Sequence, residues 1–543
     1  MPENVPECFD SVVVGAGFSG LYLIKRLRDA GFSVRAIEAA PSVGGTWYWN
    51  AYPGARCDVE SFDYCYSFSR DLEEEWNWSE RYPSQSELLA YLNHVADRFD
   101  LRRDICFDTR VTAAEWDEAR AVWTVALDSG ESIEGRFCIL AGGAISVPKP
   151  PEIDGIESFR GACYHTGSWP QTPVDFTGQR VAVIGTGSSG VQTSTAIVDQ
   201  VAQLTVFQRT PNFCAPIINY PLTPGDLAEF RRTSAARHEV SRHSARGVPY
   251  PPSDRSALEV SDAECEAILA RAWEESHLFA LRLSFRDVME NEAANEKVAE
   301  FVRSKIREIV HDLQVAETLS PRSYPYATKR PCIGKDYYAM FNRAHVRLVD
   351  LRETPIVRMT QCGIETTAGE MPFDAVVFAT GFDALTGAAA RIDIAGRGGI
   401  RLRDAWAAGP ETYLGIATSG FPNLFLVTGP GSPGPLSAMV KSIEQHVDWI
   451  ADCMAAMRER RQVSIETLPE FQAAWMDHVQ EVADGTLYPR ADSWYTGANV
   501  PGKPRRFMPY LGGVGLYRAK CDAVAKAGYE GFDLVPARIL TPL

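Results

Sequence analysis

The sequence predicts an α/β fold with two similar strand–loop–helix units and a separate helical segment. Two short apolar runs, residues 11–14 and 181–184, are each followed by a Gly-x-Gly-x-x-Gly loop and then by apolar residues at helical spacing. Residues 222–320, by contrast, show helical spacing without a strong strand signal. Recurrence of one supersecondary unit predicts two lobes, which suits a chain of 543 residues, too long for one ordinary core.

The first glycine loop has the context of a dinucleotide site, although an ordinary tight turn is the alternative. Gly15, Gly17 and Gly20 follow a strand and open a helix that also carries Ser19, so backbone N–H groups and the helix dipole can hold a pyrophosphate. Glu38 lies 18 residues after Gly20, where a carboxylate can accept hydrogen bonds from ribose hydroxyls. The first unit is therefore predicted to be a Rossmann-like domain that prefers FAD or NAD.

The second loop repeats this pattern, but the residue at the end of the following strand is an arginine instead of a glutamate. Its glycines and two polar neighbours are Gly185, Gly187, Ser188, Gly190 and Gln192. Arg209 stands 19 residues after Gly190, where a guanidinium pairs with a 2′-phosphate that a carboxylate would repel. This predicts NADP binding, unless Arg209 is only a solvated strand-end residue. Two dinucleotide sites in one chain favour a flavoprotein in which NADPH reduces FAD.

The rest of the chain completes these two domains. Residues 261–264 read as a helix start, Val298, Val302, Ile306 and Ile309 recur at helical spacing, and residues 374–381 read as a further buried strand. We therefore expect two Rossmann-like domains with a helical insertion. The expected parts are an FAD-binding domain in 1–145 and 385–543, an NADP-binding domain in 146–221 and 326–384, and the insertion in 222–325.

Composition excludes several other classes of function. The net charge is −16, which disfavours nucleic acid or an anionic membrane as a partner. No apolar run approaches the roughly 20 residues of a membrane span, and the N-terminus lacks a secretory pattern, so we expect a cytoplasmic protein. The 12 cysteines contain no CxxC pair, which predicts reduced thiols, no metal site and no disulfide-reductase chemistry.

The segment FRGACYHTGSWP resembles a known fingerprint. Phe159, Gly161, His165 and Trp169 match the F-x-G-x-x-x-H-x-x-x-W pattern of type I Baeyer–Villiger monooxygenases, and the resemblance covers nearly the whole chain. Further similar segments are GGTWYWNAYPGARCDVES, FQRTPNF, ATKRP, FATGFDALTG and SWYTGANVPGKPR. The segments are most similar to the phenylacetone and cyclic-ketone branch.

The resemblance implies an NADPH- and O2-dependent flavin monooxygenase. Such an enzyme inserts one oxygen atom beside a ketone carbonyl through a C4a-peroxyflavin, giving an ester or lactone, with sulfide oxidation as a side activity. The implied partners are a small ketone and O2, and the chain would be a monomer or weak oligomer. Two alternatives stay open: an N- or S-oxygenating flavin monooxygenase, and an NADPH-binding redox sensor.

The resemblance also implies roles for individual residues. Arg330 matches the active-site arginine and Asp58 its paired acid, while Lys329 matches a position that helps Arg209 hold the 2′-phosphate. Thr210 follows Arg209 and is expected to add a hydroxyl contact. His165 would couple movement of the lobes to catalysis, although a satisfied core histidine is the equal alternative. Positions along FAD or over NADP are matched by Thr46, Trp47, Asn50, Asp58, Tyr64, Val111, Met439 and Trp494.

Two departures from the family pattern bear on the substrate pocket. Pro433-Gly434-Pro435 is stiff and small for a loop that shapes the pocket in relatives. Ala144 stands where relatives often have an amide side chain near the flavin. Substrate preference therefore cannot be transferred across these positions.

Overall fold

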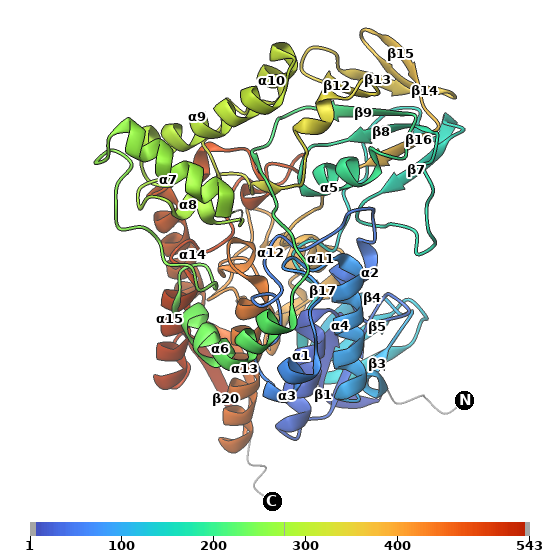
Figure 1. Cartoon of the computed structure of the whole chain (residues 1–543). Helices are drawn as coiled ribbons and strands as arrows, with labels where there is room; N and C mark the ends of the chain where they lie inside the picture. Colours follow the sequence, from blue (N-terminus) through green and yellow to red (C-terminus); the bar gives the residue numbers. More distant parts are fainter. Residues whose placement is uncertain (1–6, 276, 538–543) are drawn as a thin grey trace, which may run out of the picture.

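The computed structural model describes residues 7–275 and 277–537, and its first sheet forms the base of the first lobe (Figure 1). The strands of this sheet are β1 (Cys8–Val14), β2 (Val34–Ile37), β3 (Ile105–Cys106), β4 (Val111–Asp117), β5 (Val122–Leu127), β6 (Ser132–Leu140), β17 (Asp393–Ala395) and β18 (Leu424–Leu426). Their order is β17-β4-β5-β6-β1-β2-β3, with β18 beside β6. Strands β6, β1, β2 and β3 are parallel, whereas β4, β5 and β6 form an antiparallel meander.

The second sheet is parallel throughout. Its strands are β7 (Ala162–His165), β8 (Arg180–Ile184), β9 (Gln203–Gln208), β12 (Val346–Asp350) and β16 (Ala375–Phe378), in the order β12-β9-β8-β16-β7. All four residues of β16 are buried, as expected for a strand that is paired on both sides and covered on both faces. The described α/β architecture with two parallel-rich sheets agrees with the predicted fold class.

Both sheets collect strands from distant parts of the sequence. Strands β17 and β18 return to the first sheet after the chain has left the second, and β12 and β16 join β9 and β8 after the helical segment. This pattern is that of two domains assembled from two parts each. The domain boundaries given above stay predictions.

Helices dominate residues 224–319, and they pack on both lobes. They are α6 (Pro224–His243), α7 (Asp262–Glu275), α8 (Ala280–Leu283), α9 (Glu292–Ile309) and α10 (Leu313–Leu319). Buried Val298, Val302 and Ile306 of α9 join the core of the second lobe. Phe230 of α6 instead joins the core of the first lobe, and Figure 1 shows α6 low in the molecule, away from α7 and α9. The insertion therefore bridges the lobes.

The remaining elements belong to both lobes. The helices are α1 (Phe18–Asp29), α2 (Thr46–Trp49), α3 (Arg70–Glu75), α4 (Gln85–Arg98), α5 (Ser188–Ile197), α11 (Gly387–Ala390), α12 (Leu402–Ala405), α13 (Met439–Glu459), α14 (Pro469–Asp484) and α15 (Val514–Lys526). Short strands form three further small sheets: β10 (Cys214–Ala215) with β11 (Cys332–Ile333), β13 (Ile356–Met359) with β14 (Gly363–Thr366) and β15 (Gly369–Pro372), and β19 (Gln462–Thr467) with β20 (Phe532–Pro536). Within the described ranges, no helix is long and apolar enough to cross a membrane.

Candidate functional site

The first glycine loop forms a tight cradle between β1 and α1. Gly15 has a φ of 107°, a conformation that favours glycine. A Cβ atom on Gly20 would lie 1.9 Å from the carbonyl oxygen of Gly15, so helix and strand could not approach this closely with any other residue. Gly17 is the N-cap residue of α1, and Ser19 is buried in its first turn. The loop thus presents the N-terminus of α1 in the way a pyrophosphate requires.

Glu38 follows β2 and fixes this loop. Its carboxylate accepts hydrogen bonds from the backbone N–H groups of Ala16 at 2.7 Å and Ala40 at 2.9 Å. Burial raises the pKa of Glu38, and these hydrogen bonds oppose the increase. Since each carboxylate oxygen can accept a further bond, Glu38 can serve both the loop and a ribose hydroxyl.

The other residues expected along FAD lie in three places. Thr46 and Trp47 are in α2, and Asn50 caps this helix by donating to the Thr46 carbonyl at 2.8 Å. The Tyr64 ring lies edge-on to Trp47, with 5.8 Å between ring centroids. Met439 begins α13 and packs on the same apolar cluster as Tyr64. Val111 begins β4 and belongs to a separate apolar cluster.

The second glycine loop has the same construction. Gly185 has a φ of 118°, and a Cβ atom on Gly190 would lie 2.0 Å from the Gly185 carbonyl oxygen. Gly187 caps α5, whose first residue, Ser188, donates its hydroxyl to the Cys332 sulfur at 3.8 Å. This second cradle again leaves a helix N-terminus available to a pyrophosphate.

Gln192 ties α5 of the second lobe to a loop of the first. Its amide oxygen accepts from the Tyr52 hydroxyl at 2.8 Å, and its amide nitrogen donates to the Arg56 carbonyl at 3.1 Å. The loop held in this way continues directly to Asp58. Gln192 therefore contacts the segment that carries a predicted catalytic residue.

Arg209 and Lys329 bring two positive charges together beside the second loop. Arg209 is exposed just after β9, and the Lys329 amino group lies 4.8 Å from the Tyr324 ring centroid. Burial lowers the pKa of Lys329, the charge of Arg209 lowers it further, and Asp492 opposes both. No ion pair involves either cation within the described residues. Thr210 follows Arg209, and its carbonyl accepts from the Thr186 hydroxyl at 2.9 Å.

Arg330 and Asp58 form a two-pronged ion pair between segments that are 272 positions apart. Nε and Nη2 of Arg330 each donate to one carboxylate oxygen of Asp58 at 2.7 Å. Nη1 donates to the Pro435 carbonyl, also at 2.7 Å. Burial opposes the charged guanidinium, but Asp58 outweighs it and raises the pKa of Arg330 above its ordinary value. The site therefore holds a permanent, oriented cation.

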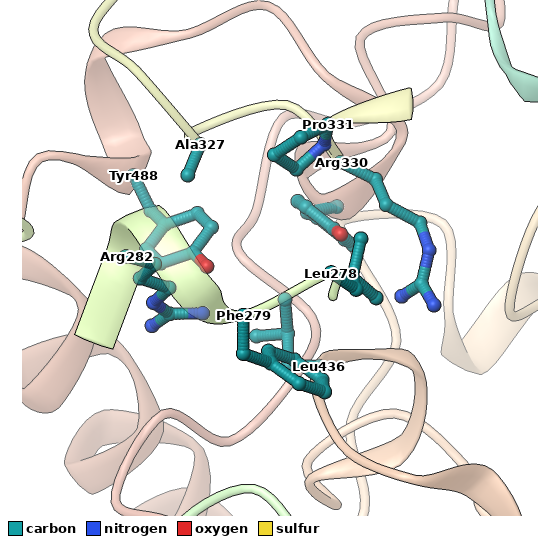
Figure 2. Close-up of a pocket in the computed structure, with 9 residues that line it drawn as sticks. Leu278, Phe279, Arg282, Ala327, Arg330, Pro331, Leu436 and Tyr488 are labelled. Carbon is teal, nitrogen blue, oxygen red and sulfur yellow. The ribbon is translucent and has the colours of Figure 1, made fainter. Parts of the chain in front are cut away.

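A pocket opens beside this cation, as Figure 2 shows. Its lining comes from the helical insertion, the 327–331 segment, the Pro-rich loop and the C-terminal region: Leu278, Phe279, Arg282, Ala327, Arg330, Pro331, Leu436, Tyr488 and Tyr495. Sequence reasoning identified only Arg330 among them. The others had no motif of their own, because ordinary apolar, aromatic and cationic side chains meet here only through tertiary packing.

Both unusual loop positions contribute backbone groups. Pro433 caps a short 3-10 turn, Gly434–Leu436, that contains the rest of this loop, and the Pro435 carbonyl accepts a hydrogen bond from Arg330. The Ala144 carbonyl accepts the Leu385 N–H at 2.8 Å. Trp494 begins another 3-10 turn, Trp494–Thr496, where its ring centroid lies 4.3 Å from that of the pocket residue Tyr495.

The fingerprint lies on the strand that borders the second sheet. His165, at the end of β7, places Nε2 3.0 Å from the Lys149 carbonyl and 3.1 Å from the Thr380 hydroxyl. Its Nδ1 accepts the Gly167 N–H at 3.0 Å, and burial lowers the pKa of this imidazole. His165 is thus a neutral ring that ties together the two connections leading into and out of this lobe.

The other fingerprint residues are structural in their contacts. Gly161 allows close approach: a Cβ atom there would lie 2.4 Å from the Asp374 carbonyl oxygen. Phe159 packs on an apolar cluster of the second sheet. Trp169 is buried, and its backbone N–H donates to the backbone carbonyl of Trp49 in α2 at 3.1 Å. The fingerprint therefore contacts the first lobe through Trp169.

The chain is similar over nearly its full length to known monooxygenases. It is 42% identical to a Baeyer–Villiger monooxygenase of Pseudooceanicola batsensis, covering 97% of this chain and 96% of the relative. It is 40% identical to a phenazine N-monooxygenase of Lysobacter antibioticus, covering 98% of each. The pyridine nucleotide-disulphide oxidoreductase family model matches residues 12–245.

Solved structures show the same similarity. A steroid monooxygenase bound to NADP is 49% identical with a TM-score of 0.94, covering 98% of this chain and all of that one. The protein OTEMO in complex with FAD and NADP is 38% identical with a TM-score of 0.94, covering 98% of this chain and 100% of that one.

Proposed function

Because this chain belongs to the Baeyer–Villiger monooxygenase family, we propose that it uses FAD, NADPH and O2 to insert an oxygen atom beside the carbonyl of a small ketone. The observation that carries this proposal is the half-buried Arg330–Asp58 pair at the edge of the pocket. Hydride transfer alone would not require a fixed cation there. A reaction in which negative charge develops on an oxygen atom does require one, because a preorganised positive charge stabilises that oxygen in a site with little water.

Arg330 has two tasks in this proposal. Its permanent charge holds the attacking oxygen as an anion and polarises the ketone carbonyl. Asp58 and the Pro435 carbonyl fix the guanidinium plane, so no reorganisation is needed during the reaction. The apolar lining by Leu278, Phe279 and Leu436 reduces water around these charges, which strengthens their interaction.

The two glycine cradles fit the two nucleotides. The loop at Gly15–Gly20 and the Glu38 carboxylate would hold FAD, and the loop at Gly185–Gly190 would hold the NADPH pyrophosphate. Arg209 and Lys329, which form no ion pair among the described residues, would hold its 2′-phosphate. FAD, once bound and reduced, supplies the activation of O2.

Oxygenation of an aromatic nitrogen is the second candidate, since a phenazine N-monooxygenase is among the relatives. That chemistry requires an electrophilic, protonated oxygen donor, whereas attack on a ketone requires an anionic nucleophile. The Arg330–Asp58 pair favours the anionic donor, and ketone oxygenation is therefore the main proposal.

The proposal is tested with the purified flavoprotein, NADPH, O2 and a panel of linear, cyclic and aryl ketones. A phenazine and a sulfide are included as competing substrates. We expect ketone products heavier by one oxygen atom, formed in proportion to the NADPH consumed. Oxygenation of the phenazine with no ester or lactone from any ketone would overturn the proposal in favour of N-oxygenation.

A further inference from the structure

A second guanidinium faces the same pocket and has no part in the proposed oxygen chemistry. Arg282 lies in α8 of the helical insertion, and Figure 2 shows it at the side of the pocket opposite Arg330. Its guanidinium lies over the Tyr488 ring, 5.4 Å from the centroid. Among the described residues, Arg282 forms no ion pair with a carboxylate.

The two guanidiniums share the same pair of aromatic neighbours. Burial raises the pKa of Tyr488, and the charges of Arg282 and Arg330 both oppose that increase. Burial likewise raises the pKa of Tyr495, and both cations oppose it. Tyr488 and Tyr495 are therefore within electrostatic range of both cations.

Arg330 and Arg282 differ in how their charge is balanced. Arg330 has the Asp58 carboxylate and the Pro435 carbonyl as partners, whereas Arg282 contacts Tyr488 and pairs with no carboxylate among the described residues. A half-buried cation without a counter-ion gains from any anion that enters beside it. The guanidinium fork matches a planar carboxylate especially well, because it can donate two parallel hydrogen bonds.

We propose that Arg282 binds a carboxylate on the substrate, so that the preferred substrates are keto acids whose ketone lies at Arg330 and whose carboxylate lies at Arg282. The inference rests on the proposed function and adds the substrate class. The net charge of −16 disfavours general attraction of anions. Preference for an acid would therefore report a local contact.

The test compares a keto acid with its methyl ester, which differ in charge but hardly in shape. A series of aryl methyl ketones with one to four methylenes before the carboxylate covers different separations of the two groups. For at least one member, we expect the wild-type holoenzyme to have a kcat/KM for the acid about tenfold or more above that for the ester. Arg282→Met should lower the acid value about 10- to 100-fold, as for loss of one charge-assisted pair, and change the ester value less than threefold.

The controls separate local charge from general effects. Arg286→Met removes an exposed arginine of the same segment, which pairs with Glu259, and should leave both values unchanged. Arg282→Lys should keep part of the preference. If Arg282→Met does not bind flavin, Arg282→Gln is used in its place, because it retains donors but not charge.

The outcomes distinguish the two proposals. Oxygenation of the esters without any preference for an acid overturns the role of Arg282 and leaves the ketone chemistry standing. A preference that persists in both neutral Arg282 variants also overturns it. No oxygenation of any ketone, acid or ester would instead overturn the proposed function.

Discussion

At the scale of single residues, the decisive feature is a half-buried charge that the fold holds in one orientation. Arg330 reaches Asp58 and the Pro435 carbonyl with three of its nitrogens. Removing one partner of this half-buried pair leaves the other charge uncompensated. Replacement of Arg330 and replacement of Asp58 are therefore expected to change the activity in different ways.

Replacing Arg330 should separate flavin reduction from oxygen insertion. Arg330→Ala should be isolated with FAD, because neither glycine cradle nor Glu38 contacts this side chain, and NADPH should still reduce it. Ester formation should fall by about 10²–10³, the usual effect of losing one preorganised electrostatic group. The measurement is ester and hydrogen peroxide formed per NADPH consumed.

Asp58→Asn is the matched comparison, since it keeps the side-chain shape and leaves the cation in place but poorly oriented. We expect a smaller loss of ester, with more of the NADPH recovered as hydrogen peroxide. Near wild-type rate and coupling in Arg330→Ala would contradict the assignment of this residue.

Arg209 and Lys329 predict the choice of nicotinamide. Burial lowers the pKa of Lys329 and the charge of Arg209 lowers it further, so a 2′-phosphate beside both cations would offset this cost. Arg209→Ala should therefore raise the KM for NADPH about tenfold or more, as expected for loss of about 1.5–3 kcal/mol. Turnover with NADH should hardly change.

The control for this prediction is Arg343→Ala, which removes an exposed cation of the same lobe that pairs with Asp199. It should leave both KM values unchanged. Equal losses for NADPH and NADH in Arg209→Ala would show that Arg209 does not bind the phosphate.

At the scale of elements, the fingerprint connects strand β7 to the chain segments that enter and leave the second lobe. His165 contacts Lys149, which precedes β7, and Thr380, two residues after β16. Trp169 contacts α2 of the first lobe through its backbone. A change in the relative position of the lobes would have to pass through these contacts.

His165→Ala should therefore slow NADPH oxidation and oxygenation together while the protein remains yellow. A merely structural histidine would lower the melting temperature and leave turnover per folded, FAD-containing molecule near normal. His165→Asn, whose side-chain oxygen can still accept the Gly167 N–H in place of Nδ1, should show an intermediate effect. Stopped-flow reduction by NADPH and the melting temperature, measured on the same samples, distinguish these outcomes.

Local features of this structure were predictable from sequence, whereas the composition of the pocket was not. Gly20 and Gly190 indicate a close contact between strand and helix, because no other residue fits there. The apolar spacing in α9 indicates a single buried face. The pairing of Arg330 with Asp58 needed the family resemblance. Arg282 and the Pro435 carbonyl meet the site only through packing of distant segments, which no local pattern encodes.

At the scale of the whole molecule, one buried and two half-buried histidines make the fold sensitive to acid. Burial lowers the pKa of His165, and it lowers the pKa of His277 and His446 to about 4. His446, in α13, is completely buried, with its Nδ1 3.2 Å from the Thr428 N–H and its Nε2 2.8 Å from the Tyr517 hydroxyl. These contacts are compatible with a neutral imidazole, and the positive charge of Arg518 lowers the pKa of His446 further.

The sign of the effect follows from proton uptake. Between pH 6.5 and about 4, the unfolded chain protonates His446 and the folded chain does not, so stability falls as the pH decreases. With these two pKa values, His446 alone should cost about 2 kcal/mol between pH 8 and pH 5. His446→Gln, which keeps a donor near Tyr517, should be less stable at pH 8 but should lose less of its remaining stability on acidification.

The measurement is the melting temperature of the flavin-loaded protein at pH 8 and pH 5, for wild type and variants. His243→Gln is the control, because His243 is exposed and pairs with Glu239 on the surface; its profile should match that of wild type. His165 and His277 titrate with the same sign, so His446→Gln should flatten the profile only in part. A pH dependence that is the same in His446→Gln and wild type would mean that this histidine takes up its proton as readily in the folded protein as in the unfolded chain.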